Sequence, residues 1–95
     1  MPDNLNIVFI GRKPAMSYVL AVITSLSSSN AKEIILKARG QAITTAVDVA
    51  EIVRSRFLKE LKVDKIAIGT EQMPAREGES SARMVSTMEI TLKKD

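Results

Sequence analysis

The residues best suited to chemistry in this 95-residue chain lie in two short basic turns. The first, Gly11-Arg12-Lys13-Pro14, follows the apolar run LNIVFI (residues 5–10) and precedes a helical pattern. Proline suits the first turn of a helix, where its missing N–H would have no partner. A helix N-terminus favours anions, so two cations beside it predict a phosphate site. The alternative is a basic turn that is merely solvated.

The second turn, Lys37-Ala38-Arg39-Gly40-Gln41, repeats the layout of strand end, cations and helix start. Gly40 can adopt a positive φ or bring the backbone close to a ligand. In a parallel β-α-β-α unit, the carboxyl ends of both strands lie at the same edge of the sheet. The basic residues of the two turns are therefore expected to cluster at that edge: Arg12, Lys13, Lys37 and Arg39.

A polar segment near the C-terminus, residues 74–81 (PAREGESS), predicts the tip of a long β-hairpin. Two legs of about ten residues at ~3.3 Å each give a hairpin longer than about 30 Å, so the tip should project. Arg76 and Arg83 lie near it, beside Glu77 and Glu79. Two interpretations remain open: a mobile solvated loop, or an arm whose arginines enter a nucleic-acid groove.

Composition excludes most catalytic equipment. The chain has no cysteine and no histidine, which removes thiolate nucleophiles, the commonest general base and the usual metal ligands. Asp48 and Glu51 are interpreted as solvated or paired with nearby arginines. Neither enzymatic activity nor a metal or cofactor is expected. Residues 1–58 carry seven basic and four acidic residues, and a surplus of this kind could attract a polyanion.

Hydrophobic periodicity predicts one α/β (α+β) domain over residues 1–95 with the order β-α-β-α-β-β. The expected elements are strands at 5–10, 32–38 and 63–72 and around 87–93, a first helix that follows Pro14 and ends at the polar cluster 27–30, and a second helix at about 41–58. A right-handed crossover should make the first two strands parallel, and the last pair should be antiparallel. We expect a four-stranded mixed sheet with both helices on one face and a first strand buried on both faces.

The apolar face of the second predicted helix is wider than the ~100° stripe that covers one sheet. A second copy of the chain is expected to bury the remainder in a symmetric dimer. The candidate interface residues on this helix are Val49, Ile52, Val53 and Phe57. Four methionines are interpreted as filling the core: Met16, Met73, Met84 and Met88.

Several ordered blocks resemble the Alba family of archaeal chromatin proteins. They are IGRKPAMSYVL (10–20), KARG (37–40) leading into Ala42-Ile43, residues 47–57, and VSTMEI (85–90). The resemblance spans roughly residues 7–93 and implies the fold derived above. It also implies a homodimer that coats and compacts double-stranded DNA without much sequence preference and also binds RNA; higher assembly of the dimers along DNA is left open.

The resemblance implies roles for single residues. Arg12 and Lys13 match the family's basic pair at the DNA surface, Lys37 and Arg39 match its second basic turn, and Phe57 matches an aromatic used between dimers. Arg12 stands where an acetylatable lysine is common, and Gln41 and Thr45 stand where basic residues are frequent. Met84 replaces a common arginine. Weaker binding than that of the most basic members is therefore expected.

We expect a soluble protein that is located in the cytoplasm and associated with the chromosome, and not with a membrane. No apolar stretch approaches ~18 residues, and MPDNLN lacks the basic region of a signal peptide. Two other functions remain open: an RNA-binding ribonucleoprotein subunit, and a regulatory domain that binds a phosphorylated metabolite.

Overall fold

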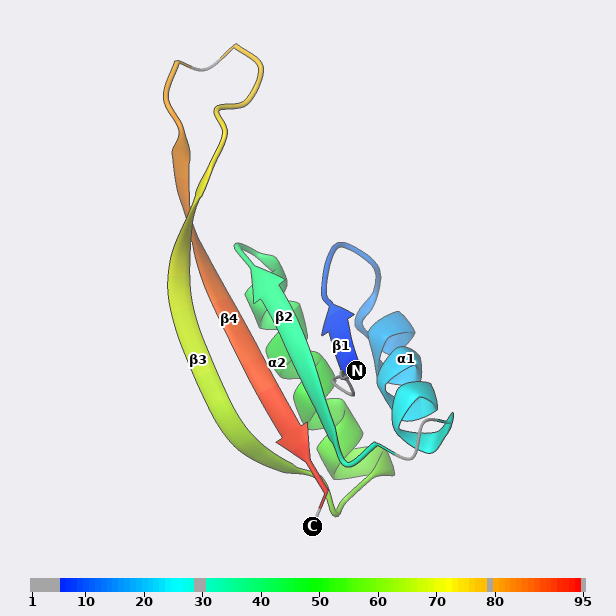
Figure 1. Cartoon of the computed structure of the whole chain (residues 1–95). Helices are drawn as coiled ribbons and strands as arrows, with labels where there is room; N and C mark the ends of the chain where they lie inside the picture. The colour runs from blue at the N-terminus through cyan, green and yellow to red at the C-terminus, as the bar shows by residue number, and fades with distance from the viewer. Residues whose placement is uncertain (1–5, 29–30, 79, 95) are drawn as a thin grey trace.

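The computed structural model describes residues 6–28, 31–78 and 80–94. The described segments form four strands and two helices in the predicted order β-α-β-α-β-β (Figure 1). They are β1 (Asn6–Phe9), α1 (Ala15–Ser28), β2 (Glu33–Arg39), α2 (Ala42–Ile52) with its terminal turn η1 (Val53–Phe57), β3 (Lys62–Met73) and β4 (Arg83–Lys93).

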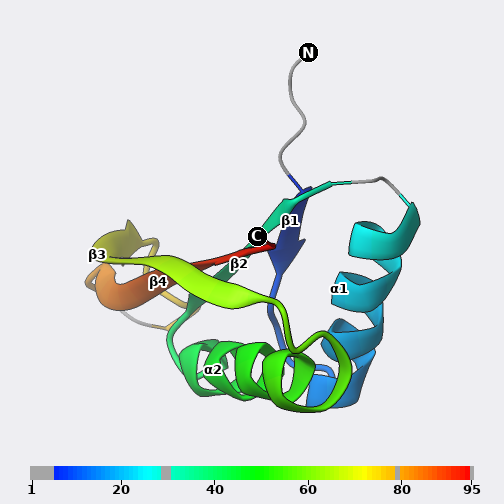
Figure 2. The ribbon, with the colours of Figure 1, turned by 90° about the horizontal axis from the view of Figure 1, so that it is seen from below.

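The four strands form one mixed sheet in the order β1-β2-β4-β3. β1 and β2 are parallel and are joined through α1, whereas β4 pairs antiparallel with both β2 and β3. Seen from below, both helices lie on the same side of the sheet (Figure 2). The predicted mixed sheet with two helices on one face is confirmed.

The core lies between this sheet and the two helices. Alternating residues of the central strands point toward the helices and are buried, because successive side chains of a strand face opposite sides. The buried side chains include Ile34, Leu36, Ile90 and Leu92 from the strands, Val19, Val22 and Leu26 from α1, and Ala46, Val49 and Val53 from α2 and η1.

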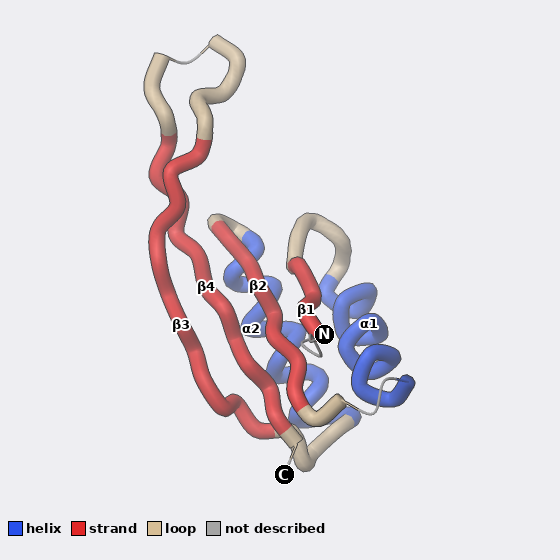
Figure 3. Tube along the Cα trace, in the orientation of Figure 1, coloured by secondary structure: helices blue, strands red, loops and turns tan. Residues whose placement is uncertain are grey.

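β3 and β4 extend well beyond the rest of the sheet as a two-stranded arm (Figures 1 and 3). The principal dimensions of the molecule, 47 × 30 × 20 Å, reflect this projection. The arm ends in a loop after Met73 in which Gly78 has a φ of 87°. The expectation of a projecting hairpin is confirmed; Glu79, at its tip, lies outside the described residues.

The expectation that the first strand is buried on both faces is wrong. Val8 packs against the core, but Ile7 is 37% exposed and Phe9 is 72% exposed. The physical reason is that both helices lie on one side of the sheet, where α1 packs against β1, so the other side of β1 is left open. Ile7 and Phe9 therefore lie on the open face of the sheet.

The second helix also differs from its prediction at its end. Leu58 N donates a 2.8 Å hydrogen bond to Val53 O, so the last turn is π-helical and departs from 3.6-residue spacing. Val49 and Val53 are fully buried within the protomer, Ile52 is half-buried, and Phe57 is 48% exposed. Because α2 contacts α1 as well as the sheet, the width of its apolar face is explained without a second copy at Val49 and Val53.

The methionines do not act uniformly as core. Met88 packs against the core, whereas Met16 and Met84 are 45% and 68% exposed. Met73 is half-buried at the end of β3, directly before the loop of the arm. The prediction is therefore wrong for Met16 and Met84, which lie on an outward helix face and on the arm.

Candidate nucleic-acid interface

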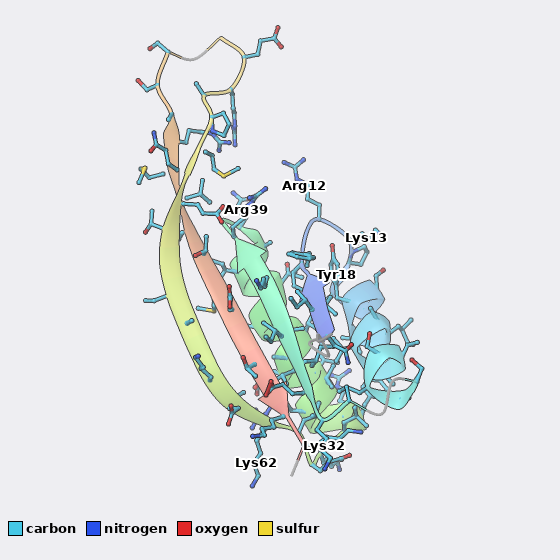
Figure 4. All side chains as sticks on the ribbon, viewed as in Figure 1. Arg12, Lys13, Tyr18, Lys32, Arg39 and Lys62 are labelled. Carbon is cyan, nitrogen blue, oxygen red and sulfur yellow. The ribbon has the colours of Figure 1, made fainter. Side chains whose placement is uncertain are left out.

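Residues of both basic turns and of the arm line one open groove of about 1070 Å³. Among the described residues that line it are five cations and no carboxylate; the cations are Arg12, Lys13, Arg39, Arg76 and Arg83. Figure 4 shows Arg12, Lys13 and Arg39 at the end of the sheet from which the arm projects, and Lys32 and Lys62 at the opposite end. The lining of the groove therefore has an excess of positive charge, which suits an anion.

The first basic turn is held in place by a buried tyrosine that sequence reasoning missed. The Tyr18 hydroxyl accepts hydrogen bonds from Gly11 N at 2.9 Å and from Lys13 N at 3.0 Å. A Cβ at position 11 would lie 3.3 Å from that hydroxyl, which explains the glycine. The two backbone bonds fix the turn on either side of Arg12, while its side chain extends outward (Figure 4).

The second basic turn is fixed by backbone geometry. Gly40 has a φ of 59°, which L side chains rarely adopt, and its N–H donates to Ser86 O of β4 at 2.9 Å. α2 then begins without a side-chain cap at Gln41 and without an acidic residue in its first turn. Because Gln41 and Ala42 line the groove, the positive end of the α2 dipole adds to the field there.

An ion pair links the second turn to the arm. Arg39 Nη1 lies 3.2 Å from Glu71 Oε1 on β3 and also donates to the sulfur of Met73 at 3.7 Å. The side chains of Arg39 and Glu71 are more than half exposed, so the pair contributes little to stability, about 0–1 kcal/mol. Its consequence is positional, because it places the guanidinium between β2 and the arm.

Lys37 is the one predicted turn cation that does not line the groove. It lies on the open face of the sheet, where its ammonium group is 3.5 Å from the Glu89 carboxylate. The structure thus brings Arg12, Lys13 and Arg39 together in the groove, whereas Lys37 lies outside it, in a neighbouring hollow that Arg39 also lines. Gln41, Arg76 and Arg83 do line the groove; Arg83 belongs to the last strand pair of the arm, opposite Met73, and Arg76 lies in the loop beyond that pair.

The acidic residues and the helices of the described part of the chain indicate no metal site and no membrane-spanning helix. Within the described part of the chain, no three His, Cys, Asp or Glu side chains lie close enough to hold a metal ion. No described helix is long and apolar enough to cross a membrane. Glu51 pairs with Arg54 at 2.6 Å, in agreement with the interpretation of the α2 carboxylates as paired.

Fold and groove define a class: a small two-layer α/β domain with a basic groove at one end of its sheet and a projecting β-arm beside it. Comparison with known families makes the assignment specific. The model of the family described as Alba matches residues 6–70, and the chain belongs to the Alba family.

Relatives extend the match over nearly the whole chain. The DNA/RNA-binding protein Alba of Methanocella arvoryzae is 48% identical over 94 residues, covering 99% of this chain and 94% of that protein. DNA/RNA-binding protein Alba 1 of Archaeoglobus fulgidus is 53% identical over 89 residues, covering 94% and 96%. The solved structure of Alba from Thermoplasma volcanium superimposes with a TM-score of 0.84 at 48% identity, covering 94% of this chain and all of that one.

Proposed function

We propose that this chain binds double-stranded DNA and RNA through the basic groove, without catalysis and with little sequence preference. The observation that carries the proposal is the groove itself, in which the described lining includes five cations and no carboxylate. The names of the relatives, DNA/RNA-binding protein Alba, support the same ligands. An architectural role on the chromosome follows from binding of this kind.

The arrangement of the groove favours the phosphate backbone as the group that is bound. Arg12 and Lys13 lie on a turn fixed by Tyr18, and Arg39 lies where the second turn meets the arm. Contacts to phosphates position a protein on nucleic acid but do not read its sequence. Arg83, in the last strand pair of the arm, and Arg76, in its loop, contact the ligand where the hairpin reaches toward a groove of the duplex.

A homodimer is part of the proposal, and the apolar surface of β3 supports it. Ile66 and Ile68 pair with Ile90 and Met88 of β4 and share their face, but they are 56% and 80% exposed because β3 is an edge strand and the helices pack against β1, β2 and β4. A symmetric partner that covered them would continue the core across the edge of the sheet. Phe57, which is also exposed, remains the candidate for contact between dimers.

Salt dependence of binding tests the groove. If each of the five cations neutralises one phosphate, log K falls with log salt with a slope of at most about 4.5 per groove. Arg12→Ala with Lys13→Ala should weaken binding to all duplex sequences and reduce that slope by about 1.8. The matched control is Lys32→Ala with Lys62→Ala, which removes two charges at the opposite end of the sheet.

Equal slopes for the two double variants would refute the groove as the binding surface. Long duplex, structured RNA and free nucleotides belong in the same titration. Binding of RNA alone would favour a ribonucleoprotein subunit, and binding of a nucleotide alone would favour a metabolite-binding domain.

A further inference from the structure

Phe9 is an aromatic side chain in an unusual position. The chain has three aromatic residues, and Phe9 is 72% exposed at the end of β1, on the face of the sheet that the helices leave open. An exposed phenylalanine of this kind does not contribute to the core. Aromatic side chains on an open sheet are a common platform for unpaired nucleobases, which stack on their rings.

The neighbours of Phe9 form a hollow of about 460 Å³, within the range of small-molecule sites. The strand register puts Phe9 beside Lys37, and Lys37 beside Glu89, so the three form a row across β1, β2 and β4. Thr87 and Glu71 also line the hollow. One aromatic ring is thus surrounded by an ammonium group, two carboxylates and a hydroxyl.

The hollow is continuous with the basic groove. Ile10 and Arg39 line both, and Phe9 is separated from the Gly11-Arg12-Lys13 turn by Ile10 alone. If the phosphates of a nucleic-acid strand lie in the groove, the next base of that strand therefore lies over the open face of the β-sheet. The net charge of the hollow suits a base and not a phosphate, because Lys37 and Arg39 are paired with Glu89 and Glu71.

We propose that this hollow receives one unpaired nucleobase of a single strand whose backbone occupies the basic groove. The proposal rests on the proposed nucleic-acid function. The base stacks on the exposed ring of Phe9, while Glu89 accepts hydrogen bonds from amino groups on its edge and Lys37 and Thr87 donate to its carbonyl oxygens. A base within a duplex is excluded, since extruding it costs unpairing and unstacking energy.

The test compares Phe9→Ala and Phe9→Trp with the wild-type chain on three probes. These are a single-stranded oligonucleotide, an abasic strand with the same number of phosphates, and a duplex. Ile7→Ala is the matched control, because Ile7 is exposed on the same face of β1 but does not line the hollow.

Phe9→Ala should weaken binding of the single strand by about 5- to 100-fold, the usual effect of losing one stacked base. Phe9→Trp should restore it, and duplex and abasic-strand affinities should not change. RNA and DNA single strands, tested separately, identify which source of unpaired bases is preferred. A photoreactive base analogue in the single strand should crosslink to position 9.

Equal loss on all three probes, or no loss on the single strand, would overturn the proposal. A change of oligomeric state in Phe9→Ala would do the same, because it would assign this face to a second copy of the chain. These outcomes can be distinguished from failure of the proposed function. If the proposed function itself were wrong, the Arg12→Ala/Lys13→Ala variant would bind duplex like the wild type.

Discussion

Replacing Tyr18 with phenylalanine would remove one oxygen atom and with it the acceptor for two backbone N–H groups. These are the N–H groups of Gly11 and Lys13, which lie 2.9 and 3.0 Å from the hydroxyl. The ring is buried, with 8% exposure, and phenylalanine can keep its packing. The substitution therefore tests the hydrogen bonds alone, with Arg12 and Lys13 still present.

The size of the effect follows from these two bonds. A hydrogen bond contributes a net stabilisation of about 0.5–1.5 kcal/mol, and water can partly replace these two because the turn is half exposed. A loss of about 1 kcal/mol in unfolding free energy would lower the Tm by roughly 4–8 °C. Ordering the released turn on binding would cost about 1–2 kcal/mol, which weakens duplex binding by about 5- to 30-fold.

The assay that separates positioning from direct phosphate contact is again the salt titration. Tyr18→Phe should lower affinity while leaving the salt slope unchanged, because the same phosphates are neutralised in the complex. Amide hydrogen exchange at Gly11 and Lys13 should become faster. Ser17→Ala, which removes an exposed hydroxyl from the same helical turn, is the control. Wild-type affinity in Tyr18→Phe, or a slope reduced like that of the double turn variant, would refute the reasoning.

Three other perturbations test the groove, the dimer and the arm. Glu71→Gln removes the carboxylate that competes with phosphate for Arg39. Duplex affinity at low salt, measured by fluorescence titration, should therefore rise by about 2- to 5-fold. A lower affinity would instead mean that Glu71 holds Arg39 in its binding position. Ile68→Asp alters a side chain that is 80% exposed, so sedimentation velocity should find a folded monomer; an unchanged dimer would place the interface elsewhere. Arg76→Ala/Arg83→Ala should weaken duplex binding less than loss of the first basic turn. Protease cleavage at the arm tip should be slower with saturating duplex, and an unchanged rate would mean that the arm does not engage DNA.

The parts of the structure that could be predicted are those determined by local periodicity. The 3.6-residue spacing after Pro14 predicted α1, and alternation in residues 87–93 predicted β4, which in the structure begins earlier, at Arg83. The rule that parallel strands end at one edge of the sheet predicted that Arg12 and Arg39 lie close together, and both line the groove in the structure. These predictions succeeded because each depends on a single element or on one connection between elements.

The features that could not be predicted depend on packing between distant elements. The helical spacing of α1 places Tyr18 beside an uncharged face and indicates no partner for its hydroxyl, since only the path of the preceding turn brings that hydroxyl to Gly11 and Lys13. The wide apolar face of α2 suggested a second copy, because the wheel does not reveal that α1 packs against the same helix. The Arg39–Glu71 pair joins residues 32 positions apart and requires the register of three strands.

That register depends on one irregularity near the start of β3. Val63 pairs with Leu92 and Lys65 with Thr91, so Asp64 is an extra residue that the opposite strand does not match. In a regular ladder, a shift of one residue would turn every later side chain of β3 to the other face. Glu71 would then leave the open face and Arg39 would lose its partner, while Ile66 and Ile68 would leave the apolar face. The sequence carries a trace of this bulge, since Val63 and Ile66 are three residues apart whereas Ile66 and Ile68 are two apart. A break in period two within an otherwise alternating strand thus predicts the β-bulge that aligns the arm with the two basic turns.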